Sequence, residues 1–312
     1  MILPKILPDE LLAGYRGRIA AFNGLRTPKE VAFAIRDPDD TRPGANNQTL
    51  AVIDAAAALN GVTAETLLQR HSCLALYGGV GKTREHDHRN ERVLSAFRSL
   101  AMFNPDKRLR ACPKCVAADI HERSFAYWRR SHQVPGRFVC AFHGGALWTT
   151  AEPELVPAGP DDVSESSRPF DDVTCHRLAN NAFVARTLTI LDAIVREGLF
   201  IDSDSCNGAL RQAVRDALER GSAPESMRAI SRAIESAFTM EWLTYAMPGA
   251  SLTSGQTHNF VKNCLYEGTV PTSYAGMAVV ASLLFPTAEA ALTTMDAMSV
   301  KSATVWSDRV QL

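Results

Sequence analysis

Four side chains that suit a metal ion stand in two short pairs within one stretch of the chain. Cys112 and Cys115 form the first pair, and Cys140 and His143 form the second after twenty-four intervening residues. Soft ligand pairs separated by a helix-length insert are typical of a structural zinc site, in which two tight turns complete a tetrahedron. Three thiolates and one imidazole would fill every position around the ion. We therefore predict one structural Zn²⁺ ion, with no open position for a reactive water and no catalytic residues.

Two other interpretations of these cysteines are weaker. A chance group of buried thiols would not explain a second half-site followed by Gly144 and Gly145. A disulfide framework requires export, and the first residues lack the basic and apolar regions of a signal peptide. No apolar run approaches the roughly 20 residues that a bilayer requires. We expect a cytoplasmic protein without membrane contact.

Charge is distributed unevenly, although the net charge of the 312 residues is −1. Residues 82–137 contain thirteen Lys or Arg against six Asp or Glu, whereas residues 151–172 contain seven acids and one arginine. A basic half followed by an acidic, Pro-rich connector favours a nucleic-acid-facing module and a linker. Solvated basic helix faces are the alternative, and composition does not decide between the two.

The elements before the zinc block are predicted to be helical. Asp9 is expected to cap a helix whose apolar stripe includes Leu11, Leu12, Tyr15 and Ile19, with Arg18 on the face turned toward water or a partner. Residues 50–59 and a second helix capped by Thr63 are joined by a turn at 60–62, which is the outline of a helix-turn-helix. An ordinary helical hairpin has the same outline. Base or phosphate contacts in the second helix would come only from Gln69, Arg70 and His71, so little direct readout of sequence is expected.

The zinc block itself combines short elements. A basic strand is predicted at 107–110, a helix at 120–132 and a strand at 138–139. The glycines of 77–83 resemble a phosphate-binding loop, but Leu76 stands where that motif requires its first glycine, so we predict a plain loop. An enzyme based on His258, or on Cys175 with His176, lacks a paired base and orienting group in the sequence.

The second half of the chain shows helical periodicity throughout. About six helices are predicted, at 178–195, 207–220, 224–247, 256–266, 272–285 and 287–298. We therefore predict a mainly α fold. A helical N-terminal domain at 1–150 carries the helix-turn-helix-like hairpin and a small zinc ribbon or finger at about 105–150. A linker at 151–175 and an all-α C-terminal domain at 176–312 follow.

Residues around the zinc ligands carry a family resemblance. Cys112-Pro113-x-Cys115, the segment Tyr127 to Gly136, and Val139-Cys140-x-x-His143-Gly144-x-x-Leu147 resemble the signature of TniQ/TnsD-type transposition proteins. The opening residues 7–18 and the hairpin at 50–71 resemble further elements of that family. The resemblance covers about residues 5–150. The family usually has serine at the position of Gly14 and proline at that of Ala141.

The resemblance implies a non-catalytic adaptor that selects the target of a transposon. Such a protein binds target DNA, docks on an RNA-guided Cascade complex, or does both, and recruits an AAA+ transposition regulator. Six basic residues are then expected to contact phosphates: Lys107, Arg108, Arg110, Arg129, Arg130 and Arg137. The C-terminal half would bind DNA, a partner, or a second copy of the chain in a homodimer. The competing hypothesis is a zinc-dependent DNA-binding regulator unconnected with transposition.

Overall fold

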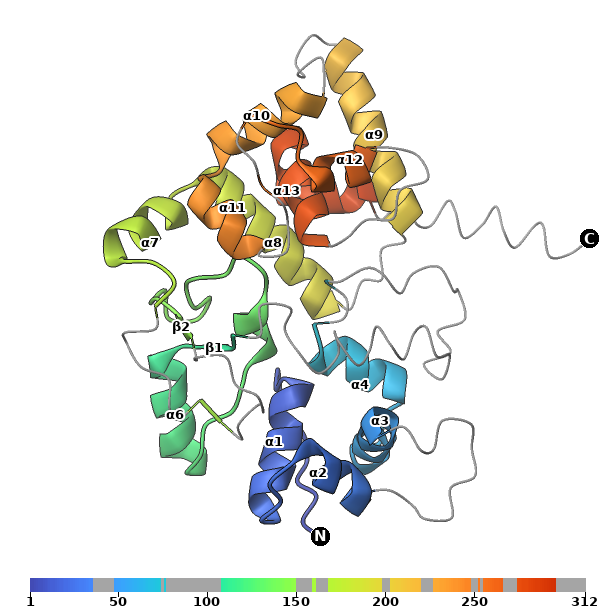
Figure 1. Cartoon of the computed structure of the whole chain (residues 1–312), viewed down its shortest axis with the longest axis vertical. Helices are drawn as coiled ribbons and strands as arrows, with labels where there is room; N and C mark the ends of the chain where they lie inside the picture. The colour runs from blue at the N-terminus through green and yellow to red at the C-terminus, as the bar shows by residue number, and fades with distance from the viewer. Residues whose placement is uncertain are drawn as a thin grey trace, which may run out of the picture. The chain divides into compact units, whose positions relative to one another are not determined.

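The chain is mainly helical, as predicted (Figure 1). The computed structural model describes residues 1–35, 48–73, 76, 108–149, 159–160, 168–197, 203–219, 227–247, 252, 255–265 and 274–295. Two compact units divide the chain: unit 1 comprises Met1–Leu74 and Thr83–Cys175, and unit 2 comprises Ala75–Lys82 and His176–Leu312. The glycine loop at 77–83 and Lys107 lie outside the described residues.

Unit 1 begins with helices that contact one another in series (Figure 1). Their bounds are α1 Leu12–Phe22, α2 Pro28–Ile35, α3 Gln48–Leu59 and α4 Ala64–His71. The turn between α3 and α4 contains Gly61 at a φ of 66°, a left-handed conformation that favours glycine. The Thr63 hydroxyl accepts a hydrogen bond from the Thr66 N–H and caps α4. The predicted helical hairpin is therefore confirmed.

Short elements make up the remainder of unit 1 that the structure describes. They are β1 Arg110–Ala111, α6 Pro113–Arg123, the 3₁₀ helix η2 Arg130–Gln133 and β2 Trp148–Thr149, with β1 antiparallel to β2. The predicted helix at 120–132 is wrong, because α6 ends at Arg123 and Ser124 takes a left-handed φ of 66°. The next residues form backbone bonds with the start of the chain, which periodicity could not reveal.

Those bonds attach an N-terminal strap, which we define as Leu7–Leu11. The Leu11 N–H donates to the Trp128 carbonyl at 2.7 Å, and the Arg130 N–H donates to the Asp9 carbonyl at 2.7 Å. The Asp9 carboxylate accepts a 2.6 Å bond from the Ser131 hydroxyl. The prediction that Asp9 caps α1 is therefore wrong. Its carboxylate instead attaches the strap to η2.

The strap also contributes half of a buried ion pair. Both carboxylate oxygens of Glu10, which is fully buried, accept bonds from the Arg18 guanidinium at 2.8 and 2.6 Å. The same guanidinium lies over the rings of Phe22 and Phe125. The expectation that Arg18 faces water or a partner is therefore wrong. A paired charge can be buried, whereas an unpaired one at this place would be strongly destabilising.

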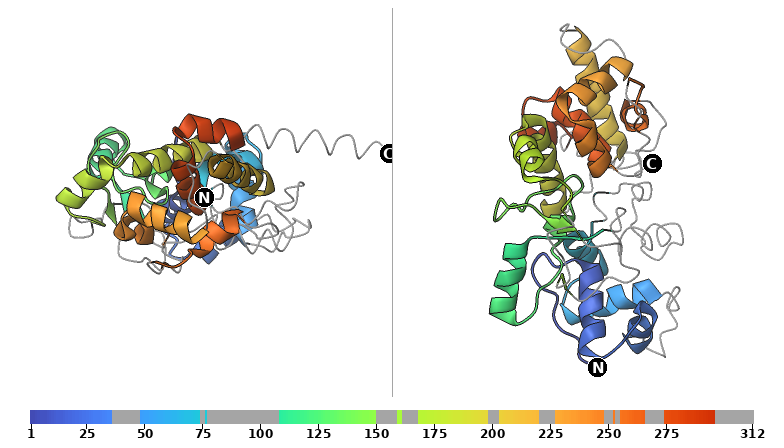
Figure 2. Two further views of the ribbon diagram at one scale, coloured as in Figure 1. Left: turned by 90° about the horizontal axis from the view of Figure 1, so that it is seen from above. Right: turned by 60° about the vertical axis from the view of Figure 1, so that its left-hand side comes forward.

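Unit 2 is built around one buried helix. Its helices include α8 Ala182–Glu197, α9 Ser203–Glu219, α10 Met227–Ala237, α11 Met240–Ala246, α12 Asn259–Leu265 and α13 Tyr274–Leu284, while α7 Asp172–Ala179 spans the boundary between the units. The helix α13 contacts α8, α9, α10 and α12 and is buried on nearly every side (Figures 1 and 2). Its mainly apolar sequence suits that central place.

Two details of unit 2 refine the predicted helices. The predicted helix at 224–247 is interrupted, because the Thr239 hydroxyl accepts a bond from the Trp242 N–H and starts α11 as a separate element. At the end of α13, the Arg186 guanidinium donates to the carbonyls of Ser282 and Phe285, which the helix leaves without partners.

Among the described residues, no single helix is both long and apolar enough to cross a membrane. Two bent pairs satisfy length and composition only together: Asp172–Ala179 with Ala182–Arg196, bent by 77°, and Tyr274–Leu284 with Ala288–Met295, bent by 118°.

Close contact between α1 and the zinc block leads to a prediction about Gly14. A Cβ at this position would lie 2.9 Å from Cδ1 of the Trp128 ring, which is fully buried. We expect Gly14→Ala to lower the free energy of unfolding by about 1–3 kcal/mol despite the better helix propensity of alanine. Chemical denaturation should be compared with Gly145→Ala, where a Cβ meets nothing within 4 Å. Equal stability of the two variants would contradict the prediction.

Candidate metal centre

The first ligand pair sits at the start of α6. Cys112 is the residue before the helix and has extended backbone angles, Pro113 occupies the first turn, and Cys115 follows one turn later. Proline suits this position because the first helical N–H groups have no partner within the helix. The Val116 N–H donates to the Cys112 carbonyl at 2.9 Å. The turn therefore holds both sulfurs on the same side of the helix start.

The second ligand pair sits on a tight hairpin. Cys140 N–H donates to the Gly145 carbonyl at 2.8 Å, and Leu147 N–H donates to the Phe138 carbonyl at 2.8 Å. Gly144 closes the loop with a φ of 64°, which explains why glycine follows His143. The hairpin buries Cys140 and leaves His143 exposed.

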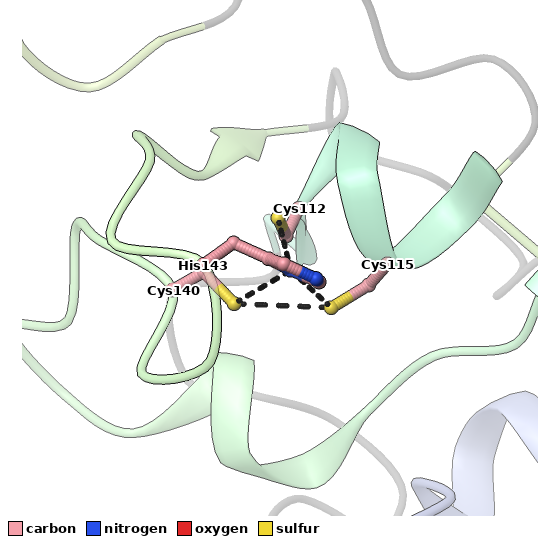
Figure 3. Close-up of side chains that lie close together, drawn as sticks. All are labelled: Cys112, Cys115, Cys140 and His143. Atoms are coloured by element: carbon pink, nitrogen blue, oxygen red, sulfur yellow. Dashed lines mark hydrogen bonds between the residues drawn. The ribbon is translucent and has the colours of Figure 1, made fainter. Parts of the chain in front are cut away.

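The four side chains converge on one point (Figure 3). The Nδ1 atom of His143 lies 3.5 Å from the Cys112 sulfur, 3.4 Å from that of Cys115 and 3.7 Å from that of Cys140. The sulfurs of Cys115 and Cys140 are 3.8 Å apart. In a tetrahedral site with bonds of zinc length, we expect edges of about 3.8 Å between sulfurs and about 3.6 Å between sulfur and nitrogen. The donors therefore fit a tetrahedral metal ion.

The pKa values of two of the thiols are shifted in opposite directions. Hydrogen bonds from Cys112 and Cys115 hold the pKa of the Cys140 thiol far below its ordinary value. Hydrogen bonds with Cys112 and Cys140 raise the pKa of the Cys115 thiol. A lowered pKa favours the thiolate form of Cys140, which is the form that binds a cation. By contrast, burial is the main cause that raises the pKa of Cys73 to about 11, as expected for an inert core thiol.

Comparison with known proteins agrees with this geometry. The family model TniQ matches residues 1–147, a range that includes all four ligands, the strap and the helical hairpin. Residues 1–147 belong to the TniQ family. Proteins of the TniQ family are associated with transposition. No curated protein matches the sequence significantly.

Three of the arginines predicted to contact DNA are buried inside the TniQ domain. Arg110, Arg130 and Arg137 are 1 %, 7 % and 5 % exposed. The Arg110 guanidinium donates to the Gln133 carbonyl at 2.8 Å, and that of Arg130 donates to the Gln69 carbonyl. The prediction that these three side chains contact phosphates is therefore wrong. Residue type alone does not show whether an arginine lies at the surface or is buried and bonded to main-chain carbonyls.

The other predicted contact residues have mixed surroundings. Arg129 is partly exposed, and its guanidinium binds the Asp119 carboxylate at 2.6 Å and lies over the Tyr127 ring. Arg108 and Arg70 are exposed, and Gln69 is half-buried. Their contacts with DNA stay predictions.

Two residues of η2 have roles that sequence reasoning missed. The Gln133 side-chain amide donates to the Arg110 carbonyl at 2.8 Å, and its oxygen accepts from the Arg110 N–H at 3.0 Å, so it extends β1 as a neighbouring strand would. His132 is buried beside the sulfurs of Cys115 and Cys140. Both lie in the family signature, but their partners are distant in sequence and only folding reveals them.

His258, considered above as part of an enzyme, lies in unit 2. It is 1 % exposed, its Nε2 is 3.1 Å from a Glu235 carboxylate oxygen, and its ring stacks on Phe260. Burial lowers the pKa of His258. Glu235 also accepts bonds from the Gly255 N–H. The pair therefore joins the segment before α12 to α10.

Loss of one ligand should remove both the metal and the local fold. We expect Cys140→Ser to lower bound metal from one ion per chain to none, and to abolish the cooperative unfolding transition of unit 1. Apparent binding free energies of about 10–16 kcal/mol for structural zinc exceed the stability of most domains. Elemental analysis and chemical denaturation followed by circular dichroism measure both effects. The control Cys73→Ala removes a buried thiol of the same unit outside the cluster and should keep its ion. Unchanged metal content and unfolding in Cys140→Ser would refute the prediction.

Proposed function

We propose that the chain is a non-catalytic adaptor that selects the insertion site of a transposon. It binds target DNA, an RNA-guided Cascade complex, or both, and recruits an AAA+ transposition regulator. The observation that carries this proposal is the TniQ match over residues 1–147. The donor set agrees with it, since four protein ligands around one ion leave no position for a substrate.

We propose zinc as the metal. Three sulfurs and one imidazole nitrogen are soft to borderline donors that suit Zn²⁺ and fit poorly with Mg²⁺ or Ca²⁺, which prefer oxygen. Cys112, Cys115, Cys140 and His143 would hold the ion, whose role is to join α6 to the hairpin. The gain is structural, because β1 and β2 contain two residues each and form little sheet of their own.

We propose that DNA contacts come from the exposed basic side chains and not from the buried arginines. Arg70 lies in the last turn of α4, Arg108 lies just before β1, and Lys114 lies in the first turn of α6. Such contacts would position the domain on phosphates without reading sequence. Target choice would then come from a partner or from unit 2, for which DNA, a partner and a second copy of the chain all remain candidates.

The phosphate contacts predict a defined salt dependence. Replacing Arg70 and Arg108 together by alanine should reduce the slope of log affinity against log salt by about 2, because each lost phosphate contact removes roughly 0.9. Fluorescence anisotropy with duplex DNA at several salt concentrations measures this slope. The control Arg123→Ala should leave it unchanged, since Glu122 already pairs with that guanidinium at 2.6 Å. A salt-independent affinity, or equal slopes in all variants, would argue against phosphate contacts.

The adaptor role predicts a requirement in transposition. Deleting the gene should abolish insertion at the selected target while the transposase and the AAA+ regulator are still produced, and the wild-type gene should restore it. The Cys140→Ser variant should fail to restore insertion, whereas Cys73→Ala should succeed. Sequencing of insertion sites measures the outcome. Targeted insertion that continues without the protein, together with sequence-specific binding to its own promoter, would support a transcriptional regulator in its place.

A further inference from the structure

A second histidine lies against the cluster without being one of its four ligands. His132 is 2 % exposed, and its Nε2 atom lies 3.7 Å from the Cys115 sulfur and 3.6 Å from the Cys140 sulfur. Those two sulfurs are 3.8 Å apart, so the imidazole sits across one edge of the tetrahedron. His143 differs in that its Nδ1 is within 3.7 Å of all three sulfurs. The geometry therefore gives His143 the place of a ligand and His132 a place outside the ligand set.

The charge of the site provides a reason for such a neighbour. A divalent ion with three thiolates and one neutral imidazole carries a net charge of about −1, and the three cysteines are buried. Buried charge requires hydrogen-bond donors. A proton on the Nε2 atom of His132 would point at both sulfurs, and distances of 3.6 and 3.7 Å suit bonds to sulfur. A lone pair on Nε2 would instead face two thiolates and be repelled.

The position of His132 is determined by its neighbours in η2. Arg130 and Ser131 bond to Asp9 of the strap, and Gln133 bonds to Arg110 of β1. Three of the four residues of this short helix are therefore held by separate parts of unit 1. The imidazole is therefore held firmly beside the sulfurs. A residue that orients a metal ligand by a hydrogen bond must itself be fixed in this way.

We propose that His132 is a positioning residue that donates its Nε2 proton to the thiolates of Cys115 and Cys140 and so retains the metal. This inference rests on the proposed metal site. The bond disperses negative charge from two of the three sulfurs, which slows ligand dissociation and lowers their reactivity with alkylating agents. It also joins η2 directly to the metal cluster.

The test compares His132→Leu, which removes the donor at similar volume, with His132→Gln, which keeps an N–H group. Zinc affinity, measured by competition with a chromophoric chelator, should fall 10- to 100-fold in the leucine variant, as is common for such outer residues, and recover at least in part in the glutamine variant. With cobalt in place of zinc, the sulfur-to-metal charge-transfer bands should move to lower energy in the leucine variant only. All three proteins should still bind one ion, since the four ligands are intact.

The outcomes separate this inference from the metal site itself. If the wild-type protein binds no metal, the metal site itself is refuted. If wild-type protein and His132→Leu have equal zinc affinities and equal cobalt spectra, only the role of His132 is refuted. If His132→Leu binds no metal while His143→Ala keeps a three-sulfur, one-nitrogen site, His132 is a ligand and the proposal is wrong.

The wild-type protein gives a test that needs no variant: with ¹¹³Cd bound, nuclear magnetic resonance should show a slowly exchanging His132 Nε2 proton coupled to the cadmium. A His132 ring with its proton on Nδ1 alone would overturn the proposal.

Discussion

The fold of unit 1 depends on the closure of three sulfurs and one imidazole around a single point. The region that they join has a strand pair of two residues each, the helix α6 and the short 3₁₀ helix η2, which is little structure to fix two distant turns. A chain of this kind buries too little apolar surface to order itself, so a metal cross-link of several kcal/mol replaces part of a core. The distances between the donors match a tetrahedral ion closely enough that the protein presents a preformed site.

Charge has a different role here from the one that composition indicates. Four arginines of unit 1 are internal: Arg110, Arg130 and Arg137 from the basic residues 82–137, and Arg18 from α1. Three of them bond a carboxylate or a main-chain carbonyl: Arg18 bonds Glu10, Arg110 bonds Gln133 and Arg130 bonds Gln69. The guanidinium group suits this task because it offers five donors in a fixed plane and keeps its charge. Three of the thirteen Lys or Arg residues of 82–137 are thus internal, so fewer cations are available for DNA than the sequence suggests.

The parts that sequence predicts well are those specified by neighbours along the chain. Ligand spacing identifies the cluster, Thr63 and Gly61 identify the hairpin, and periodicity identifies the helices of unit 2. Errors arise where a residue acts over a long range. Asp9 has the side chain of a helix cap but bonds Ser131, some 120 residues away, and the helix expected through His132 gives way to backbone pairing with the strap. Trp128 shows the same limit, since only the folded chain reveals that Gly14 makes room for its ring.

The strap and η2 connect the metal cluster to the helical hairpin of unit 1. The His71 Nδ1 atom bonds the Glu10 carbonyl at 2.9 Å, and Arg130 bonds the Gln69 carbonyl, so the end of α4 is attached to both the strap and η2. The helix η2 in turn contacts the sulfurs through His132. Within unit 1, η2 therefore connects the cluster, through His132, to the helical hairpin, through Arg130. Because these links are at least partly buried, water replaces them only at a cost, and loosening of the cluster should disturb the support of α4. A metal centre whose four ligands all come from the protein can thus hold the helical hairpin in place.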